Sequence, residues 1–318
     1  MSAFDPFEDF GDAEEIAERL TDADPAVRRL AVIDLAETAS IDVLPHLLAA
    51  GEDHDASVRL QVAIALGEFE TRDAARALAK LVKDDDPSVA QAAADSLAEV
   101  KDPAAAAEIL PSLSHPSAFV RAALFRGLRA LRSSSSLGPA LGAMRDADPN
   151  VRAEALAVIA YLKLEETLPS LIDATCDADA SVRAVAVDAL TFTTKAAARA
   201  AVAAALSDEN WQVRAAAAES LGRIGRVCDA DVLVKGLGDE YWQVQQKSLG
   251  ALGKLKVQTA VPAIAQLLES EIPALRKEAA AALGEIADPA ARESLMELAS
   301  DADPDVRKTV RWALTKLG

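Results

Sequence analysis

A pattern that recurs every 31 residues, the step from Val27 to Val58, constrains this chain more than any other feature of its sequence. The stretch from Asp22 to Arg28 reads Asp-Ala-Asp-Pro-Ala-Val-Arg, and close copies of it begin at Asp146 and Asp301. A fixed period of this length predicts stacked supersecondary units instead of one globular core. Each unit has an apolar anchor, and the anchors follow one another without insertion or deletion: Val27, Val58, Val89, Val120, Val151, Val182, Val213, Val244, Leu275 and Val306.

Each copy of the pattern predicts a hairpin of two helices. Asp24 is suited to cap the second helix, because its carboxylate accepts the free N–H groups of the first turn. Pro25 suits the first helical position, where no N–H is needed. Apolar residues then recur about every four positions, which gives one buried face: Val27, Ala31, Leu35 and Thr38. We therefore expect an all-α fold, a right-handed α-solenoid of ten 31-residue helical hairpins, forming a single domain over residues 12–318.

The first helix of each hairpin is predicted to be shorter than the second. In the second repeat it covers about Asp42 to Ala50, and Asp102-Pro103 and Asp288-Pro289 begin equivalent helices. Ser133 to Ser136 replaces this start with serines, which predicts a flexible turn. A glycine follows the apolar residue near the end of several second helices, where it permits close approach of the next helix: Gly67, Gly222, Gly253 and Gly284.

Residues 1–11 lie outside the repeat and form an acidic, aromatic N-terminal tail or cap. Phe4, Phe7 and Phe10 alternate there with acidic residues. One interpretation is a flap that covers the first helix, because terminal repeats need caps. The alternative is a short linear motif for a partner.

The net charge of −18 disfavours nucleic acid and anionic membranes as partners, because both are bound through Lys and Arg. The acidity serves either solubility or an acidic docking surface. Two cysteines, Cys176 and Cys228, give no disulfide framework and no paired metal spacing. The N-terminus shows no secretory signal and no stretch is long and apolar enough to span a bilayer, so we expect a cytoplasmic protein.

The residues from Asp208 to Gly222 nearly complete the pattern D-x-D-P-x-V-R-x-x-A-x-x-x-L-G, which resembles HEAT-like repeats of the short type named after phycobilisome lyases. The resemblance implies a ladder between each Asp and the Arg six positions later, in which the guanidinium bridges adjacent turns. The candidate pairs are Asp22 with Arg28, Asp53 with Arg59, Asp146 with Arg152, Asp177 with Arg183, Asp208 with Arg214 and Asp301 with Arg307. The ladder is interrupted at Ala90, His115, Gln245 and Ser270.

Some relatives in such families are enzymes, and the sequence can be compared with the functional residues of each. Deoxyhypusine hydroxylases bind iron through His-Glu dipeptides, and this chain has none. HEAT-like DNA glycosylases have a basic concave face, which an acidic chain disfavours. His46, His54 and His115 lack cysteine partners and are interpreted as surface or turn residues, so we expect no catalytic residue, no metal and no cofactor. Bilin lyase subunits remain as enzymatic relatives.

The second helices are expected to line the concave side of the stack. Outward positions there lie one before and two, three, six and ten after each anchor. The first repeats place an acidic patch on this face: Glu37, Glu68, Asp95 and Glu99. Aromatic, Arg and Gln side chains follow, and because such residues anchor protein interfaces they are the candidate partner-binding set: Phe119, Arg126, Tyr161, Phe192, Trp211, Gln212, Arg223, Tyr241, Trp242, Gln243 and Gln246. The alternative for Trp211 and Trp242 is that they shield the turn between helices.

These patterns favour a non-catalytic scaffold, adaptor or assembly factor that binds another protein, or an extended segment of one, on the concave face. The alternative is a maturation factor of the bilin-lyase type, or a chaperone that assists cofactor insertion. A monomer is favoured, and neither the partner nor the pathway is indicated.

Overall fold

The computed structural model describes residues 13–317, and the aromatic segment with Phe4, Phe7 and Phe10 lies outside them. Over the described range the regular elements are α-helices and short 3-10 helices, with no β-strand. Contacts divide the chain into two units, of which unit 1 ends at Leu162 and unit 2 begins at Lys163. The expectation of a single domain stays a prediction.

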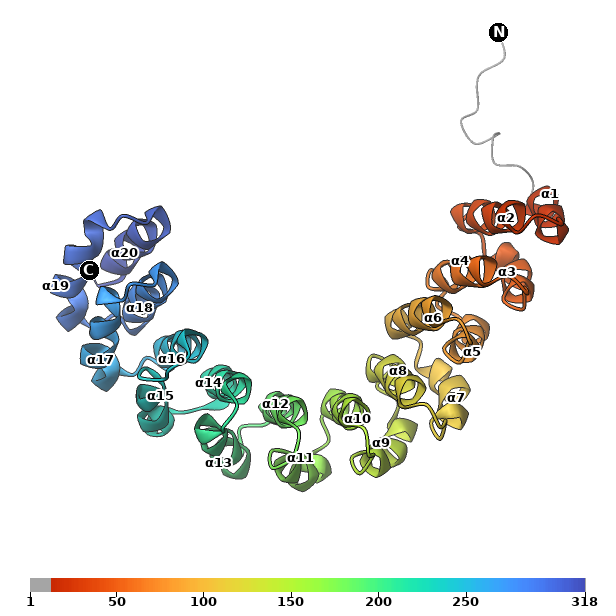
Figure 1. Cartoon of the computed structure of the whole chain (residues 1–318). Helices are drawn as coiled ribbons and strands as arrows, with labels where there is room; N and C mark the ends of the chain where they lie inside the picture. Colours follow the sequence, from red (N-terminus) through yellow and green to blue (C-terminus); the bar gives the residue numbers. More distant parts are fainter. Residues whose placement is uncertain (1–12, 318) are drawn as a thin grey trace, which may run out of the picture. The chain divides into compact units, whose positions relative to one another are not determined.

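Unit 1 is a row of helical hairpins in which the second helices pack side by side in one layer and the first helices form the other (Figure 1). Its first helices are α1 (Ala13–Glu18), α3 (Leu44–Ala50), α5 (Arg72–Leu81), α7 (Ala106–Ile109) and α9 (Leu137–Ala143). Its second helices are α2 (Pro25–Glu37), α4 (Ala56–Leu66), α6 (Pro87–Glu99), α8 (Ala118–Arg129) and α10 (Pro149–Leu162).

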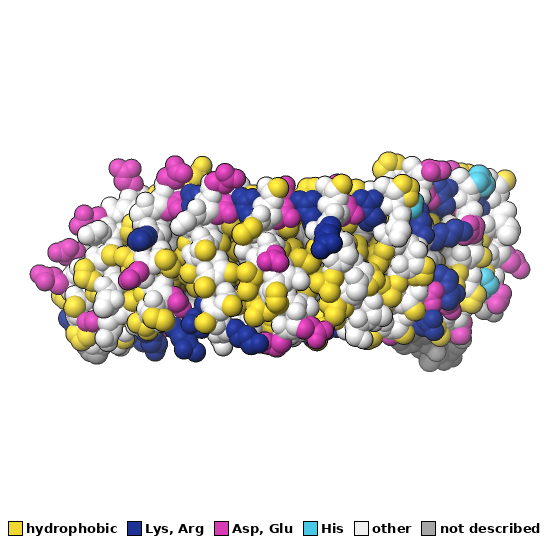
Figure 2. Space-filling model, turned by 90° about the horizontal axis from the view of Figure 1, so that it is seen from below, with side chains coloured by type: hydrophobic (Ala, Val, Ile, Leu, Met, Phe, Trp, Pro, Cys, Tyr) yellow, Lys and Arg dark blue, Asp and Glu magenta, His cyan; other side chains and the backbone are white. Residues whose placement is uncertain are grey.

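Unit 2 repeats this arrangement. Its first helices are α11 (Leu168–Ala174), α13 (Ala196–Ala204), α15 (Ala230–Gly236), α17 (Val261–Gln266) and α19 (Arg292–Glu297). Its second helices are α12 (Ala180–Ala189), α14 (Trp211–Ile224), α16 (Trp242–Lys254), α18 (Pro273–Ile286) and α20 (Pro304–Lys316). The predicted α-solenoid of repeated helical hairpins is confirmed. On the side of the first helices, Figure 2 shows hydrophobic side chains over the middle of the face and charged side chains along its edges.

The predicted start of the second helices is confirmed. Asp24 accepts a hydrogen bond of 2.8 Å from the backbone N–H of Ala26, and Pro25 is the first residue of α2. The anchors from Val58 to Val306 are buried, whereas Val27 is half-buried.

Several first helices begin with a 3-10 turn, whereas α5 and α13 begin directly as α-helices. Asp102 and Asp288 cap the turns Pro103–Ala105 and Pro289–Ala291. The serine stretch forms the same turn, Ser134–Ser136, in which the Ser136 side chain is fully buried; the turn is confirmed, and its flexibility stays a prediction. This turn therefore also forms where no Asp-Pro pair begins it.

The predicted glycine contacts are confirmed in unit 2. A Cβ placed on Gly253 would lie 2.9 Å from the Cα of Ala282, and one on Gly222 would lie 3.0 Å from the Cα of Ala251. Both distances are shorter than a normal contact, so these second helices pack at a spacing that only glycine permits.

An Arg–Asp ladder joins successive repeats, but its partners differ from the predicted ones. Arg28 donates to the backbone carbonyl oxygen of Asp22 at 2.8 Å, while its Nε and Nη2 bind the carboxylate of Asp53 in the next repeat at 2.6 and 2.8 Å. The pairing within a repeat therefore uses the backbone, and the carboxylate pairing crosses to the next repeat. The same cross-repeat bonds join Arg59 to Asp84, Arg121 to Asp146, Arg183 to Asp208, Arg214 to Asp239 and Arg276 to Asp301.

The interruptions at Gln245, His115 and Ser270 keep the backbone bond of the ladder, whereas Ala90 has no side-chain donor to make it. Gln245 donates its side-chain amide to the carbonyl oxygen of Asp239 at 2.6 Å, and the carbonyl oxygen of His115 accepts from Arg121 at 2.9 Å. At Gln245 the carboxylate bridge to the next repeat is lost, while the bond within the hairpin is kept.

Candidate protein-binding surfaces

The second-helix layer of each unit has a regular outward face. In α14 the anchor Val213 is buried, while Gln212 and Arg223, one before and ten after it, are exposed. Outward positions recur at the same offsets on every second helix, because one period of the sequence forms one helical hairpin. The polarity and charge of this face in each unit therefore depend on the few outward side chains that each repeat contributes.

In unit 1 the predicted acidic patch is exposed at the C-terminal ends of the second helices: Glu37, Glu68, Asp95 and Glu99. Asp95 is not unpaired, because Arg126 of α8 donates to its carboxylate at 2.8 Å. The sequence interpretation did not single out Leu30 and Ile64, which are 46% and 50% exposed at outward positions beside these acids. Their signal was a large aliphatic side chain three or six residues after an anchor. The patch is thus apolar as well as acidic.

The aromatic residues of unit 1 are exposed on α8 and α10. Phe119 is 43% exposed and Tyr161 is 42% exposed. The guanidinium groups of Arg129 and Arg132 lie over the Tyr161 ring, 5.7 and 5.8 Å from its centre, which positions the ring by cation–π attraction.

A half-buried carboxylate, that of Glu154, lies on the same helix as Tyr161. Burial raises the pKa of Glu154, whose Oε2 is 3.7 Å from the Nη1 of Arg129 and accepts no hydrogen bond from a described residue. The sequence interpretation missed Glu154, because nothing in the repeat pattern shows which outward carboxylates become buried.

In unit 2, Trp211 and Tyr241 form a stacked pair with ring centres 5.5 Å apart. The guanidinium of Arg214 lies 5.6 Å from the centre of the Tyr241 ring and binds Asp239 at 2.7 Å. The pair therefore covers the ladder, which supports the shielding interpretation for Trp211. Trp242, the first residue of α16, is 39% exposed and takes no part in the stack.

The remaining predicted residues of unit 2 are more restricted than the sequence suggested. Arg223 binds Asp188 at 2.6 Å and Glu219 at 2.9 Å, and Lys247 binds Glu219 at 2.6 Å. Much of the basic charge on this face is therefore paired. Phe192 and the side chains of Gln243 and Gln246 are half-buried, and Gln212 is exposed.

No cluster of metal-ligating residues occurs among residues 13–317, and no helix in that range is long and apolar enough to cross a membrane. His54 is largely exposed and His115 accepts the backbone N–H of Ser117 at 3.2 Å, as expected for surface and turn residues. Cys176 and Cys228 are both exposed, and Cys176 lies in a turn beside an open groove of about 460 Å³.

The paired helical layers and the Arg–Asp ladder define a class, the stacked helical-hairpin solenoid. The family profile described as HEAT repeats matches residues 13–97, 75–146, 138–222, 174–239 and 230–315. The chain therefore belongs to the HEAT-repeat family. No curated protein matches the sequence.

Solved structures share the fold at low identity. A structure of Kap95p, whose binding induces the switch loops of RanGDP to adopt the GTP-bound conformation, is 15% identical with a TM-score of 0.67, over 96% of this chain and 49% of its own. Importin beta is 15% identical with a TM-score of 0.56, over 96% of this chain and 45% of its own. This chain thus spans about half the length of these two proteins. An engineered protein is 21% identical over 96% of this chain and 98% of its own, with a TM-score of 0.49. The likenesses to Kap95p and importin beta show the fold alone.

Proposed function

We propose that this chain is a non-catalytic scaffold or adaptor that holds a partner protein, or an extended segment of one, against the second-helix layers of its units. The observation that carries the proposal is the exposure of large apolar side chains at outward positions of those layers: Leu30, Ile64, Phe119, Tyr161, Trp242 and Trp312. Exposed aromatic residues beside Arg are typical anchors of protein interfaces.

Rigid presentation is the mechanism that the packing supports. Ladder bonds and close glycine contacts fix the spacing of successive second helices within each unit. A partner that binds such a preformed surface loses less conformational freedom than one that must order a loop. The HEAT-repeat fold itself is typical of protein-interaction scaffolds, and a cytoplasmic location is part of the same proposal.

The proposal is tested by affinity capture from the source cell with two matched baits. In the first, Phe119, Tyr161 and Trp242 are replaced by alanine. In the control, Val227 and Met296, each 59% exposed but on the first-helix side, are replaced by alanine. We expect a protein that wild type and the control capture and the aromatic variant loses, while circular dichroism shows equal helix content.

Equal capture by all baits would remove the aromatic residues from the site. Capture of no protein by wild type would contradict the scaffold function. Tetrapyrrole pigment that co-purifies with wild type and is lost from the aromatic variant would instead support the bilin-lyase alternative, which the resemblance to phycobilisome-lyase repeats suggested.

A further inference from the structure

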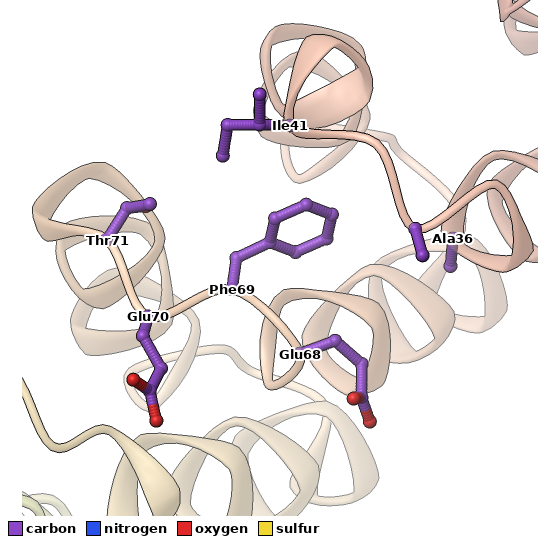
Figure 3. A pocket seen from close by; sticks show the side chains of 7 residues that line it. Ala36, Ile41, Glu68, Phe69, Glu70 and Thr71 are labelled. Carbon is purple, nitrogen blue, oxygen red and sulfur yellow. The ribbon is translucent and has the colours of Figure 1, made fainter.

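Unit 1 contains a pocket of about 420 Å³ beside the C-terminal ends of α2 and α4. Its size falls in the range of about 300–1,000 Å³ that ligand pockets occupy. Figure 3 shows the ring of Phe69 pointing into the space between Ile41 and Ala36, with the carboxylates of Glu68 and Glu70 extending away from the ring. The Phe69 pocket is lined by Ala36, Ala39, Ile41, Glu68, Phe69, Glu70 and Thr71.

The backbone fixes the walls of this pocket. Ala39 adopts a left-handed conformation with φ of 50°, which turns the chain after α2 so that Ile41 is 58% exposed. Phe69 is only 7% exposed, and its backbone N–H donates to the carbonyl oxygen of Leu66 while its carbonyl oxygen accepts from Thr71 at 2.9 Å. The backbone turn and these hydrogen bonds therefore hold the walls of the pocket in place.

This combination of side chains is specific to one repeat. Phe69 is the only aromatic residue at its repeat position; the other repeats have Thr38, Val100, Leu131, Leu162, Thr193, Ile224, Leu255, Ile286 and Leu317 there. A gap required by the stacking would not need an aromatic ring in one repeat alone. The Phe69 pocket is therefore a local feature of this end of unit 1.

The charge around the pocket is negative. Glu68 and Glu70 of its lining are exposed, and the Nζ of Lys101 lies 3.9 Å from the carboxylate of Glu70. The C-terminal ends of α2 and α4 add the partial negative charge of their free carbonyl groups. An apolar cavity with negative charge beside it is complementary to an apolar side chain with cations on either side.

We infer that the Phe69 pocket binds one large aliphatic or aromatic side chain of a partner protein segment that carries Lys or Arg on both sides of that side chain. The inference rests on the proposed scaffold function and names the chemistry of the partner. The chain's own residues 1–12 do not fit this description, because Asp5, Glu8 and Asp9 accompany their phenylalanines.

The test uses the full-length protein and a short fluorescein-labelled peptide with one central leucine flanked by lysines, followed by fluorescence anisotropy at low salt. One control peptide replaces the leucine with alanine, and the other replaces the lysines with glutamine. We expect each control peptide to bind about tenfold more weakly or worse, since a factor of ten corresponds to one apolar side chain or a few charge contacts.

Two protein variants test the two halves of the site. Ile41→Ala removes an exposed wall, and its matched control is Val227→Ala, at the same repeat position of unit 2 and 59% exposed. Glu68→Gln with Glu70→Gln removes charge, and its control is Glu293→Gln with Glu297→Gln, which changes the net charge equally on exposed residues of unit 2. We expect only Ile41→Ala and the Glu68/Glu70 variant to weaken binding, by about tenfold each.

Equal binding of the leucine and alanine peptides, or equal loss in Ile41→Ala and Val227→Ala, would overturn the inference. Self-association that Ile41→Ala abolishes would make a second copy the occupant and overturn it as well. Tighter peptide binding after removal of residues 2–12 would identify that segment as the occupant and also overturn it. If the peptide test fails but a partner is captured in a way that needs Tyr161 and Trp242, only this inference is rejected. If the peptide binds as expected but no partner is captured, only the proposed function is rejected.

Discussion

Replacing Arg183 by glutamine tests whether the Arg–Asp ladder stabilises the stack. Arg183 and Asp208 are 9% and 11% exposed, and two bonds of 2.7 and 2.8 Å join the guanidinium to the carboxylate. Glutamine at position 245 keeps the backbone bond of its repeat, so Arg183→Gln is expected to keep the bond to the Asp177 carbonyl oxygen and to lose only the bridge.

The expected loss follows from the bonds and the burial of this pair. Net contributions of hydrogen bonds to charged groups are about 1.5–3 kcal/mol, and breaking a fully buried ion pair costs about 3–5 kcal/mol. Because the ladder lies at the edge of the helical layers, water partly rehydrates the freed carboxylate of Asp208. We therefore expect Arg183→Gln to lower the free energy of unfolding by about 2–3 kcal/mol.

Urea unfolding followed by circular dichroism measures this change, and a double-mutant cycle isolates the pair. The double variant of Arg183→Gln and Asp208→Asn resembles the natural step at Gln245, so it is expected to recover about 1–2 kcal/mol relative to additivity. The control cycle uses Lys195 and Glu165, an ion pair whose side chains are each 55% exposed, where we expect a coupling of about 0–1 kcal/mol. A ladder coupling no larger than the control coupling would refute the reasoning.

The same pair predicts a pH dependence. Burial acts to raise the pKa of Asp208, but the hydrogen bonds from Arg183 and from the backbone N–H of Asn210 outweigh it, so the pKa lies below its ordinary value. A carboxyl with a lowered pKa contributes stability above its unfolded pKa of about 4, and this contribution is lost as the pH falls through the lower folded value. The difference between wild type and Arg183→Gln should therefore shrink below about pH 4.

Two further predictions concern packing and a buried carboxylate. Gly253→Ala should lower the free energy of unfolding by about 1–3 kcal/mol, because its Cβ would meet the Cα of Ala282 at 2.9 Å. The control Gly142→Ala in α9, where a Cβ would have no atom within 4 Å, should raise the free energy of unfolding by about 0.5–1 kcal/mol. Equal effects of the two substitutions in urea unfolding would contradict the close approach of the helices at Gly253. Burial raises the pKa of Glu278 and a bond from Gln246 opposes it only in part, so the ionised side chain is disfavoured as the pH rises above its unfolded value. Glu278→Gln should therefore raise the urea midpoint at neutral pH and lose this advantage below about pH 4, and an equal gain at both values would exclude the titration as its cause.

Much of the fold could be predicted because its signals are local and repeated. The cap by Asp24, the helix start at Pro25 and the buried anchors depend on residues within one helical turn or one face. The outward offsets also held for Phe119 and Tyr161, which are exposed on the second helices, and Trp242, at the start of its helix, is exposed as well. Whether these residues bind a partner stays a prediction.

The parts that sequence reasoning missed depend on contacts between repeats. The offsets of Gln243 and Arg223 place both side chains on the outward face. The offset of Arg223 does not show, however, that its guanidinium forms ion pairs with Asp188 and Glu219. Glu154 and Glu278 occupy outward positions, yet their surroundings bury them enough to raise the pKa of both. The offset of a residue from its anchor predicts the direction of its side chain, but not which partners or how much burial the adjacent residues provide.

The sequence by itself determined that this chain forms stacked helical hairpins and where each hairpin begins, because helix caps and periodic apolar faces act within a few residues. Tertiary structure decided that Arg28 binds the carboxylate of Asp53, 25 residues further on, and that Trp211 stacks on Tyr241. It also decided that Phe69, although almost fully buried, lines a pocket. These outcomes depend on distances between side chains of adjacent repeats, which are set only once the helices have packed.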